Sequence, residues 1–443
     1  MTAKFLQLEK GQYSNLIEQL KKENERLNAF NFIDEKEEKT GKIISVKDNI
    51  CVKGMPATAS SRILQGYVPG FNATAVERLE KNGFSVIGKT NMDEFGFGSF
   101  GLNSEKPAKN PFDIEYVAGG SSSGSAIATA IIKDHVSIAE STGGSISAPA
   151  AFCGVVGLTP TYGLVSRYGL IDYASSLDKI GFMGKSADNI REVMSKTVGS
   201  DPKDTTSLSK NASNENSRVL YVIDNLMEGI DEGIKDRFES LLGNLKNKGY
   251  KVEHTKIDYL KYAVPAYYIL SMSEASTNLA KYQGFKYGFK VKDFSLNYND
   301  FFMSARKQFG REAKRRVILG TFIRSKSIKQ KYYEKSLVLR QSIIKMMQAV
   351  LKKGFIITPT MPIFTPKIDE VKDIGPVEAY SMDMLTVPPN LCGFPHMSFP
   401  YFYERGMPLG AQLITDHFND YALLDFLSEW EKDFKYTFKE ELG

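Results

Sequence analysis

Along the first 190 residues, apolar runs of strand length alternate with stretches of helical spacing. Residues 43–46 and 84–88 are apolar runs typical of buried strands. Residues 75–81 between them have the spacing of a short helix. The run 126–132 predicts a second helix, begun by hydroxyl residues suited to a helix N-terminus, and 135–141 predicts a further strand. This alternation predicts an α/β fold with helices on both faces of a sheet.

The pattern changes along the rest of the chain. Residues 200–218 are polar and turn-rich, which predicts a surface loop, and 227–350 are mainly helical and more basic. Strand patterns return at 355–362 and continue near the C-terminus. Residues 1–30 predict an N-terminal helical segment with four apolar residues on one side: Leu16, Ile17, Leu20 and Leu27.

Composition and charge exclude several classes of protein. The net charge of +5, from 57 basic and 52 acidic residues in 443, permits a nucleic-acid partner without arguing for one. The three cysteines are far apart, which predicts neither a disulfide framework nor a metal site and fits a reducing compartment. No apolar run approaches the ~20 residues that span a bilayer, so we expect no membrane association.

The run VAGGSSSGSAIATA, residues 117–130, allows three interpretations. A flexible linker is disfavoured because the run passes directly into an apolar helix. A phosphate-binding loop would need a lysine beside Gly124, and none is there. The third interpretation is a GxSxG match with Ser122 as a nucleophile, but none of the four histidines stands in a convincing motif for its base.

A lysine can replace histidine as the base when burial keeps its amine neutral. Lys47 follows an apolar strand and is therefore a candidate, although most lysines are exposed. A second Gly/Ser stretch, STGGSISAPA at 141–150, supplies another serine in a tight loop.

Together these segments resemble the amidase signature family. The resemblance is carried by SVKDNI, GKTNMDEFGFGS, AGGSSSGSA, STGGSISAPAAFCGVVGLTPTYGLVSRYGL and SSLDKIG. It implies one domain over residues 1–443 with the amidase-signature fold, a large mixed sheet covered by helices on both faces. It also implies three catalytic residues: Lys47, Ser121 and Ser145.

The resemblance further implies a mechanism. Ser145 attacks a carboxamide carbon, and Ser121, which follows a cis peptide bond in the family, relays the proton to neutral Lys47. The backbone amides of Thr142, Gly143 and Gly144 would form the oxyanion hole, where one donor is typically worth about 3–4 kcal/mol.

Three further stretches resemble the branch of the family that forms the A (glutaminase) subunits of tRNA-dependent amidotransferases. They are YYILSMSEASTNLAKYQGFKYG, FGREAKRRVILGTF and MDMLTVPPNLCGFPHMSFP. This branch implies that Arg316 binds the α-carboxylate of glutamine, that Asp383 binds its α-ammonium, and that Tyr267 forms a hydrogen-bonding wall. The choices of Arg316 over Arg315 and of Tyr267 over Tyr268 stay open.

The same branch implies partners and a setting. The chain would supply ammonia to a B subunit that binds tRNA and carries out transamidation of Glu-tRNA(Gln), Asp-tRNA(Asn) or both, with a small C subunit. The partner would also use ATP and Mg²⁺, with no cofactor or metal in this chain. The expected location is the cytoplasm, and an organellar matrix fits as well. The alternatives are a stand-alone amidase for small carboxamides and a scaffold with weakened activity.

The nucleophile loop departs from the family pattern Ser-Asp-Thr-Gly-Gly-Ser-Ile-Arg. Here Glu140 and Ser141 replace the Ser-Asp pair, and Ser147 replaces the Arg. Losing one member of a buried ion pair strands a charge, whereas losing both need not. We therefore expect a hydroxyl network around Ser141 and Ser147 in place of the ion pair.

Overall fold

The computed structural model describes residues 5, 7–9, 11–36, 38–437 and 442. Its described residues form one mixed sheet of twelve strands. Across the sheet the strands are β2 (Phe30–Ile33), β4 (Phe84–Thr90), β3 (Gly41–Lys47), β5 (Val136–Ser141), β7 (Lys179–Gly184), β6 (Val156–Thr159), β11 (His396–Glu404), β12 (Met407–Ile414), β10 (Phe355–Pro359), β8 (Val219–Ile223) and β9 (Lys251–Thr255). The short strand β1 (Gln7–Leu8) pairs with β3. The mixed α/β architecture is confirmed.

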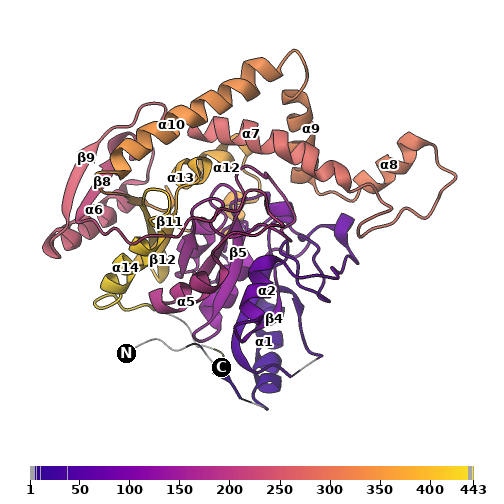
Figure 1. Ribbon diagram of the computed structural model, residues 1–443, viewed down its shortest axis with the longest axis horizontal. Coiled ribbons are helices and arrows are strands. Elements are labelled where there is room, and N and C mark those ends of the chain that lie inside the picture. The colour runs from indigo at the N-terminus through magenta and orange to yellow at the C-terminus, as the bar shows by residue number, and fades with distance from the viewer. Residues whose placement is uncertain (1–4, 6, 10, 37, 438–441, 443) are drawn as a thin grey trace.

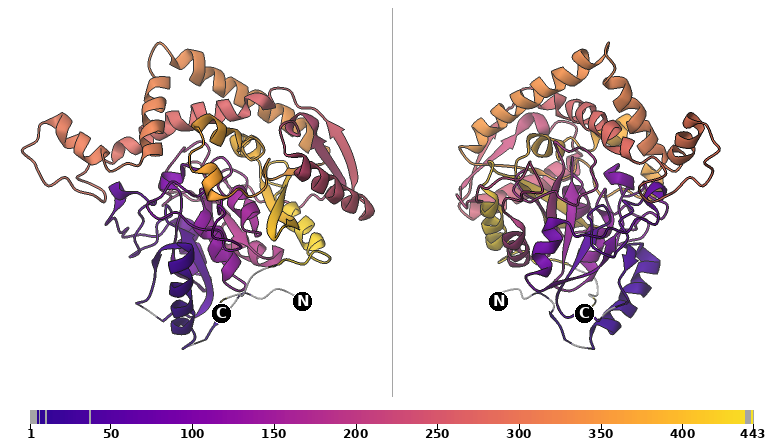
Figure 2. Two further views of the ribbon diagram at one scale, coloured as in Figure 1. Left: turned by 180° about the vertical axis from the view of Figure 1, so that it is seen from behind. Right: turned by 45° about the vertical axis from the view of Figure 1, so that its right-hand side comes forward.

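Helices cover both faces of this sheet (Figures 1 and 2). They are α1 (Tyr13–Leu27), α2 (Thr74–Glu80), α3 (Ser123–Ile131), α4 (Ser147–Phe152), α5 (Ala187–Thr197), α6 (Glu232–Asn247), α7 (Ala263–Asn278), α8 (Tyr298–Arg306), α9 (Arg311–Ile323), α10 (Lys335–Leu351), α11 (Ile368–Val371), α12 (Pro376–Ser381), α13 (Val387–Cys392) and α14 (Asp420–Trp430). In Figure 1, α7 and α10 lie together across the top of the molecule, and α8 projects to one side.

The alternation of side chains along the strands explains why both faces need helices. In β3, Ile44 and Val46 join a core with α2, α5 and α14, whereas Ile43 joins a separate core with α1 and α3. Strands that are buried on both faces have to be apolar at successive positions, and this produces the continuous runs seen in the sequence.

Two expected segments differ from the structure. The helix within 1–30 covers only Tyr13–Leu27, and residues 1–4, 6 and 10 lie outside the described residues. The range 227–350 also contains β9, which pairs in parallel with β8 at the edge of the sheet. In the described part of the chain, no helix is long and apolar enough to cross a bilayer.

Candidate active site

Two parallel strands bring the first candidate residues together. Lys47 is the last residue of β3, and β3 pairs in parallel with β5. The loop from β5 to α4 carries Ser145. It starts at the C-terminal end of β5, next to the C-terminal end of β3, where Lys47 lies. The turn that leads into α3 carries Ser121 to the same place, and the Ser122 amide donates to the Ser145 carbonyl oxygen at 3.2 Å.

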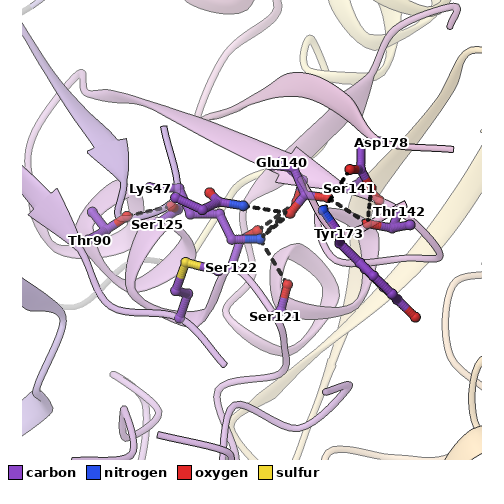
Figure 3. A network of polar contacts seen from close by, with 12 residues as sticks. Lys47, Thr90, Ser121, Ser122, Ser125, Glu140, Ser141, Thr142, Tyr173 and Asp178 are labelled. Atoms are coloured by element: carbon purple, nitrogen blue, oxygen red, sulfur yellow. Dashed lines mark hydrogen bonds and ion pairs between the residues drawn. The ribbon is translucent and has the colours of Figure 1, made fainter. Parts of the chain in front are cut away.

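Lys47 is completely buried and makes three polar contacts (Figure 3). Its Nζ lies 2.8 Å from Ser121 Oγ, 3.0 Å from the Glu140 carbonyl oxygen and 2.9 Å from Glu140 Oε2. Burial lowers the pKa of Lys47, and the Glu140 carboxylate acts in the opposite direction. The lysine is therefore placed to exchange a proton with Ser121.

The turn before α3 has a shape that only glycine permits. The Gly120–Ser121 peptide bond is cis, as the resemblance implies. A Cβ on Gly120 would lie 2.0 Å from Asp93 Oδ2, and this carboxylate accepts the amides of Gly101 and Asn103. Burial raises the pKa of Asp93 to about 6.

The structure does not support Ser122 as a nucleophile. Its side chain is fully buried, and its hydroxyl donates to the Glu140 carbonyl oxygen at 3.0 Å. Ser145, in contrast, lines a small cavity together with Gly143 and Gly144. The attacking hydroxyl is therefore better placed at Ser145 than in the GxSxG match.

Both glycines of the Ser145 loop are packed too tightly for a side chain. A Cβ on Gly143 would lie 2.4 Å from the Tyr267 ring, and one on Gly144 would lie 2.3 Å from Thr386 Oγ1. No hydrogen bond among the described residues takes up the Gly143 or Gly144 amide. These amides, with that of Thr142, are thus left to bind an oxyanion.

The opposite wall of the cavity carries both charges expected for an amino-acid substrate. Arg316 from α9 and Asp383 line it together with Tyr267 and Tyr268. Arg315 does not line it and pairs instead with Glu312 at the more exposed side of the helix. Of the two arginines, the structure therefore favours Arg316, whereas both tyrosines remain in place for substrate contact.

Arg316 and Asp383 are each held rigidly. The Arg316 guanidinium donates to Glu312 at 2.8 Å and lies 5.0–5.5 Å from the centres of four aromatic rings, those of Phe97, Tyr173, Tyr268 and Tyr380. Asp383 Oδ2 accepts the hydroxyls of Ser99, at 3.0 Å, and Tyr268. Burial raises the pKa of Asp383 to about 6.

The cavity beside Ser145 has a volume of about 10 Å³, the room of one water molecule. A second cavity of about 120 Å³ adjoins it and shares Gly98, Ser99 and Arg316 with it. An amino-acid substrate therefore needs these walls to move. A larger cavity of about 790 Å³, beside Arg237 and Phe364, contains none of the candidate residues.

Comparison with known proteins agrees with this geometry. The family model described as Amidase matches residues 17–424. The chain belongs to the amidase family. The glutaminase-branch relatives include the A subunit of the glutamyl-tRNA(Gln) amidotransferase of Sulfolobus acidocaldarius, 40% identical over 409 residues, which cover 89% of this chain and 86% of that protein. The same-named protein of Pseudothermotoga lettingae is 40% identical over 419 residues, 90% of this chain and 88% of that protein.

Solved structures of amidase-family proteins have the same fold. The crystal structure of the A subunit of the glutamyl-tRNA(Gln) amidotransferase from Thermotoga maritima matches with a TM-score of 0.81 at 34% identity, covering 97% of this chain and 94% of that one. A structure titled only as an amidase matches with a TM-score of 0.74 at 25% identity, covering 95% and 88%.

The expected hydroxyl network between Ser141 and Ser147 is wrong for this amidase. Ser141 Oγ donates to Asn390 Oδ1 at 3.1 Å, and the buried Ser147 Oγ has no hydrogen-bond partner among the described residues. Asn390 also bonds the Thr386 carbonyl oxygen and His396. The loop is therefore braced from α13, through an asparagine 249 residues away in the sequence.

Sequence reasoning assigned no role to Glu140, although the strand around it offered a signal. Residues 136–141 carry one charged side chain in an otherwise uncharged, buried strand. A carboxylate at such a position needs a partner, because burying an unpaired charge is very unfavourable. Lys47 is that partner, at 2.9 Å.

Proposed function

We propose that this chain is a glutaminase that releases ammonia from the side-chain amide of glutamine by a Ser145–Ser121–Lys47 mechanism. One observation carries the proposal: a buried lysine contacts Ser121 at 2.8 Å beside the cavity in which Ser145 faces Arg316 and Asp383. The names of the 40% identical relatives support the same activity.

The contact of Lys47 Nζ with Ser121 Oγ at 2.8 Å supports the proton transfer between these two residues in the following chemistry. Ser145 Oγ bonds to the amide carbon while its proton passes to Ser121 and the Ser121 proton passes to neutral Lys47. The amides of Thr142, Gly143 and Gly144 stabilise the oxyanion. Lys47 then returns the proton through Ser121 to the leaving nitrogen, the carbon–nitrogen bond breaks, and ammonia leaves. Water hydrolyses the acyl-enzyme by the same proton path.

The charges in the cavity support a free amino acid as the substrate. Arg316 offers a planar fork for the α-carboxylate, and Asp383 offers an anion for the α-ammonium. A simple aliphatic amide, the substrate of a stand-alone amidase, has no charged group for Arg316 or Asp383 to bind.

The ammonia would feed a multi-subunit amidotransferase in the cytoplasm. We propose that a B subunit binds tRNA, ATP and Mg²⁺ and performs the transamidation, and that a small C subunit completes the complex. Exposed apolar side chains on α9 and α10, among them Ile318, Phe322 and Val338, support a partner on the helices of residues 311–351.

The test is ammonia release from glutamine by the purified chain, alone and with co-expressed partners. We expect weak release alone, stronger release in the complex, and none from Ser145→Ala. Ser122→Ala is the matched control and should keep the reaction. Release from butyramide but not from glutamine would point to a stand-alone amidase, and no release in any combination would point to a scaffold.

A further inference from the structure

Glu140 is a buried carboxylate whose oxygens are all engaged at the catalytic end of β5. Its side chain is about 1% exposed. Oε2 contacts Lys47 Nζ at 2.9 Å and Asn49 Nδ2 at 3.2 Å, and Oε1 accepts the Thr142 hydroxyl at 2.6 Å. Figure 3 shows the Lys47 and Thr142 side chains on the carboxylate.

A second buried carboxyl group, that of Asp178, shares the Thr142 hydroxyl with Glu140. The Thr142 hydroxyl lies between Glu140 and Asp178 Oδ1, at 2.8 Å from the latter, and it has only one proton to donate. Burial and then the charge of Glu140 raise the pKa of Asp178 well above its usual value. Both Asp178 oxygens also accept backbone amides, those of Tyr173 and Ala174, whereas Glu140 Oε2 contacts Lys47 Nζ. The carboxylate paired with the lysine is therefore that of Glu140.

We propose that Glu140 is a positioning residue that holds the Lys47 amine against Ser121 and supplies the counter-charge for the proton that Lys47 takes up. The inference rests on the proposed function, in which Lys47 is the proton acceptor. The observation behind it is the contact itself, because Glu140 and Lys47 form an ion pair in which both side chains are buried.

The counter-charge acts during the attack on the amide. While Ser145 bonds to the carbon, the proton that reaches Lys47 makes an ammonium, and Glu140 pairs with it in a site without solvent. When the carbon–nitrogen bond breaks, the proton returns through Ser121 to the leaving nitrogen, and Glu140 is unchanged. The carboxylate thus stabilises the state that contains the oxyanion.

The same charge has an opposite effect on the resting enzyme. Three carboxyl groups act on Lys47: Glu140 from β5, Asp93 from the segment after β4, and Asp178 from the segment before β7. Among these, the contact with Lys47 Nζ is made by Glu140. An opposite charge this close raises the pKa of an amine, so Glu140 reduces the fraction of Lys47 that is neutral.

The first test is the pH profile of kcat at saturating glutamine in the complex with its co-expressed partners, because kcat excludes the effect of Asp383 on KM. The acidic limb follows the loss of neutral Lys47. Removing the charge in Glu140→Gln should therefore move this limb to lower pH by ~1–3 units and lower kcat on the plateau. Glu140→Asp, which keeps the charge, should restore the limb toward its original position.

The control is Asp420→Asn, which removes a fully buried carboxyl group bonded to Thr161, outside the candidate site. It should leave the acidic limb in place. A limb that stays fixed in Glu140→Gln, or that moves equally in Asp420→Asn, would overturn the proposal.

A second measurement does not depend on activity. The pKa of Lys47 can be followed by NMR of the ¹³Cε-lysine-labelled chain in the Ser145→Ala background, with Lys47→Arg for assignment. A lower pKa in Glu140→Gln supports the inference even if glutamine proves not to be the substrate. A lower pKa with an unmoved kinetic limb would contradict Lys47 as the base, and hence the proposed mechanism. An unchanged pKa would contradict the role of Glu140 alone.

Discussion

Asp383 and Arg316 line the same small cavity as Ser145 but carry opposite charges. A cation and an anion beside the proposed nucleophile suit an amide substrate that is a zwitterion. Asp383 accepts two hydroxyl hydrogen bonds, from Ser99 and Tyr268. An asparagine at this position has no charge but keeps an oxygen that can accept hydrogen bonds.

For Asp383→Asn, we expect the KM for glutamine to rise ~10–100-fold, because a charge-assisted hydrogen bond is worth about 1.5–3 kcal/mol. Hydrolysis of butyramide, which has no ammonium group, should change little. The measurement is steady-state kinetics on both amides. The control is Arg315→Gln, because Arg315 does not line the small cavity beside Ser145. Equal losses on both substrates would contradict an ammonium-binding role.

The raised pKa of Asp383 predicts a pH dependence of substrate binding. Below its pKa of about 6 the side chain is neutral, so the KM for glutamine should rise as the pH falls through 6. The rise should disappear in Asp383→Asn and should be absent with butyramide. A KM for glutamine that stays constant between pH 5 and pH 8 would rule this assignment out.

At the scale of elements, the apolar runs predict where the strands that form the site end. They do not predict the contacts between segments that lie far apart in the sequence. The runs at 43–46 and 135–141 place β3 and β5 well, because buried strands must be apolar on both faces. The edge strand β9 was missed, since its exposed Lys251 and His254 leave no apolar run. The brace from Asn390 depends on tertiary packing that no local pattern encodes.

In the loop between β5 and α4, we expect the addition of a single methyl group to reduce activity strongly. Gly143→Ala should lower kcat/KM by about 100-fold, because the new Cβ meets Tyr267 and displaces an oxyanion donor. The matched control is Gly243→Ala in α6, where a Cβ meets nothing within 4 Å. It should stabilise the fold by up to about 1 kcal/mol and leave activity intact. Full activity in Gly143→Ala would exclude this loop as the oxyanion site.

At the scale of the whole molecule, one sheet supports both the hydrophobic core and the candidate active site. The proposed catalytic side chains lie near the ends of β3 and β5, and Arg316, the proposed carboxylate ligand, comes from α9 in the helical layer beside the sheet (Figure 2). α9 packs on α7, which carries Tyr267, so this one layer supplies both Arg316 and Tyr267 to the small cavity.

Buried carboxyl groups also predict how the stability of the whole fold depends on pH. Burial raises the pKa of Asp420 to about 6, so the folded state favours its protonated form. This contribution is fully present below the unfolded pKa and is lost as the pH rises through 6. Relative to wild type, Asp420→Asn should therefore be more favourable at pH 8 than at pH 5, by roughly 1.4 kcal/mol. Urea unfolding at both pH values measures the difference, and a reversed sign would refute it.

The central claim is that Ser145 carries the γ-glutamyl group during the reaction. The most direct measurement is acid quenching of the complex during turnover of glutamine, followed by mass spectrometry of its peptides. The account predicts a γ-glutamyl ester on Ser145 that is absent from Ser145→Ala and still present in Ser122→Ala. Ammonia release with the adduct on Ser122, or with undiminished turnover in Ser145→Ala, would contradict it.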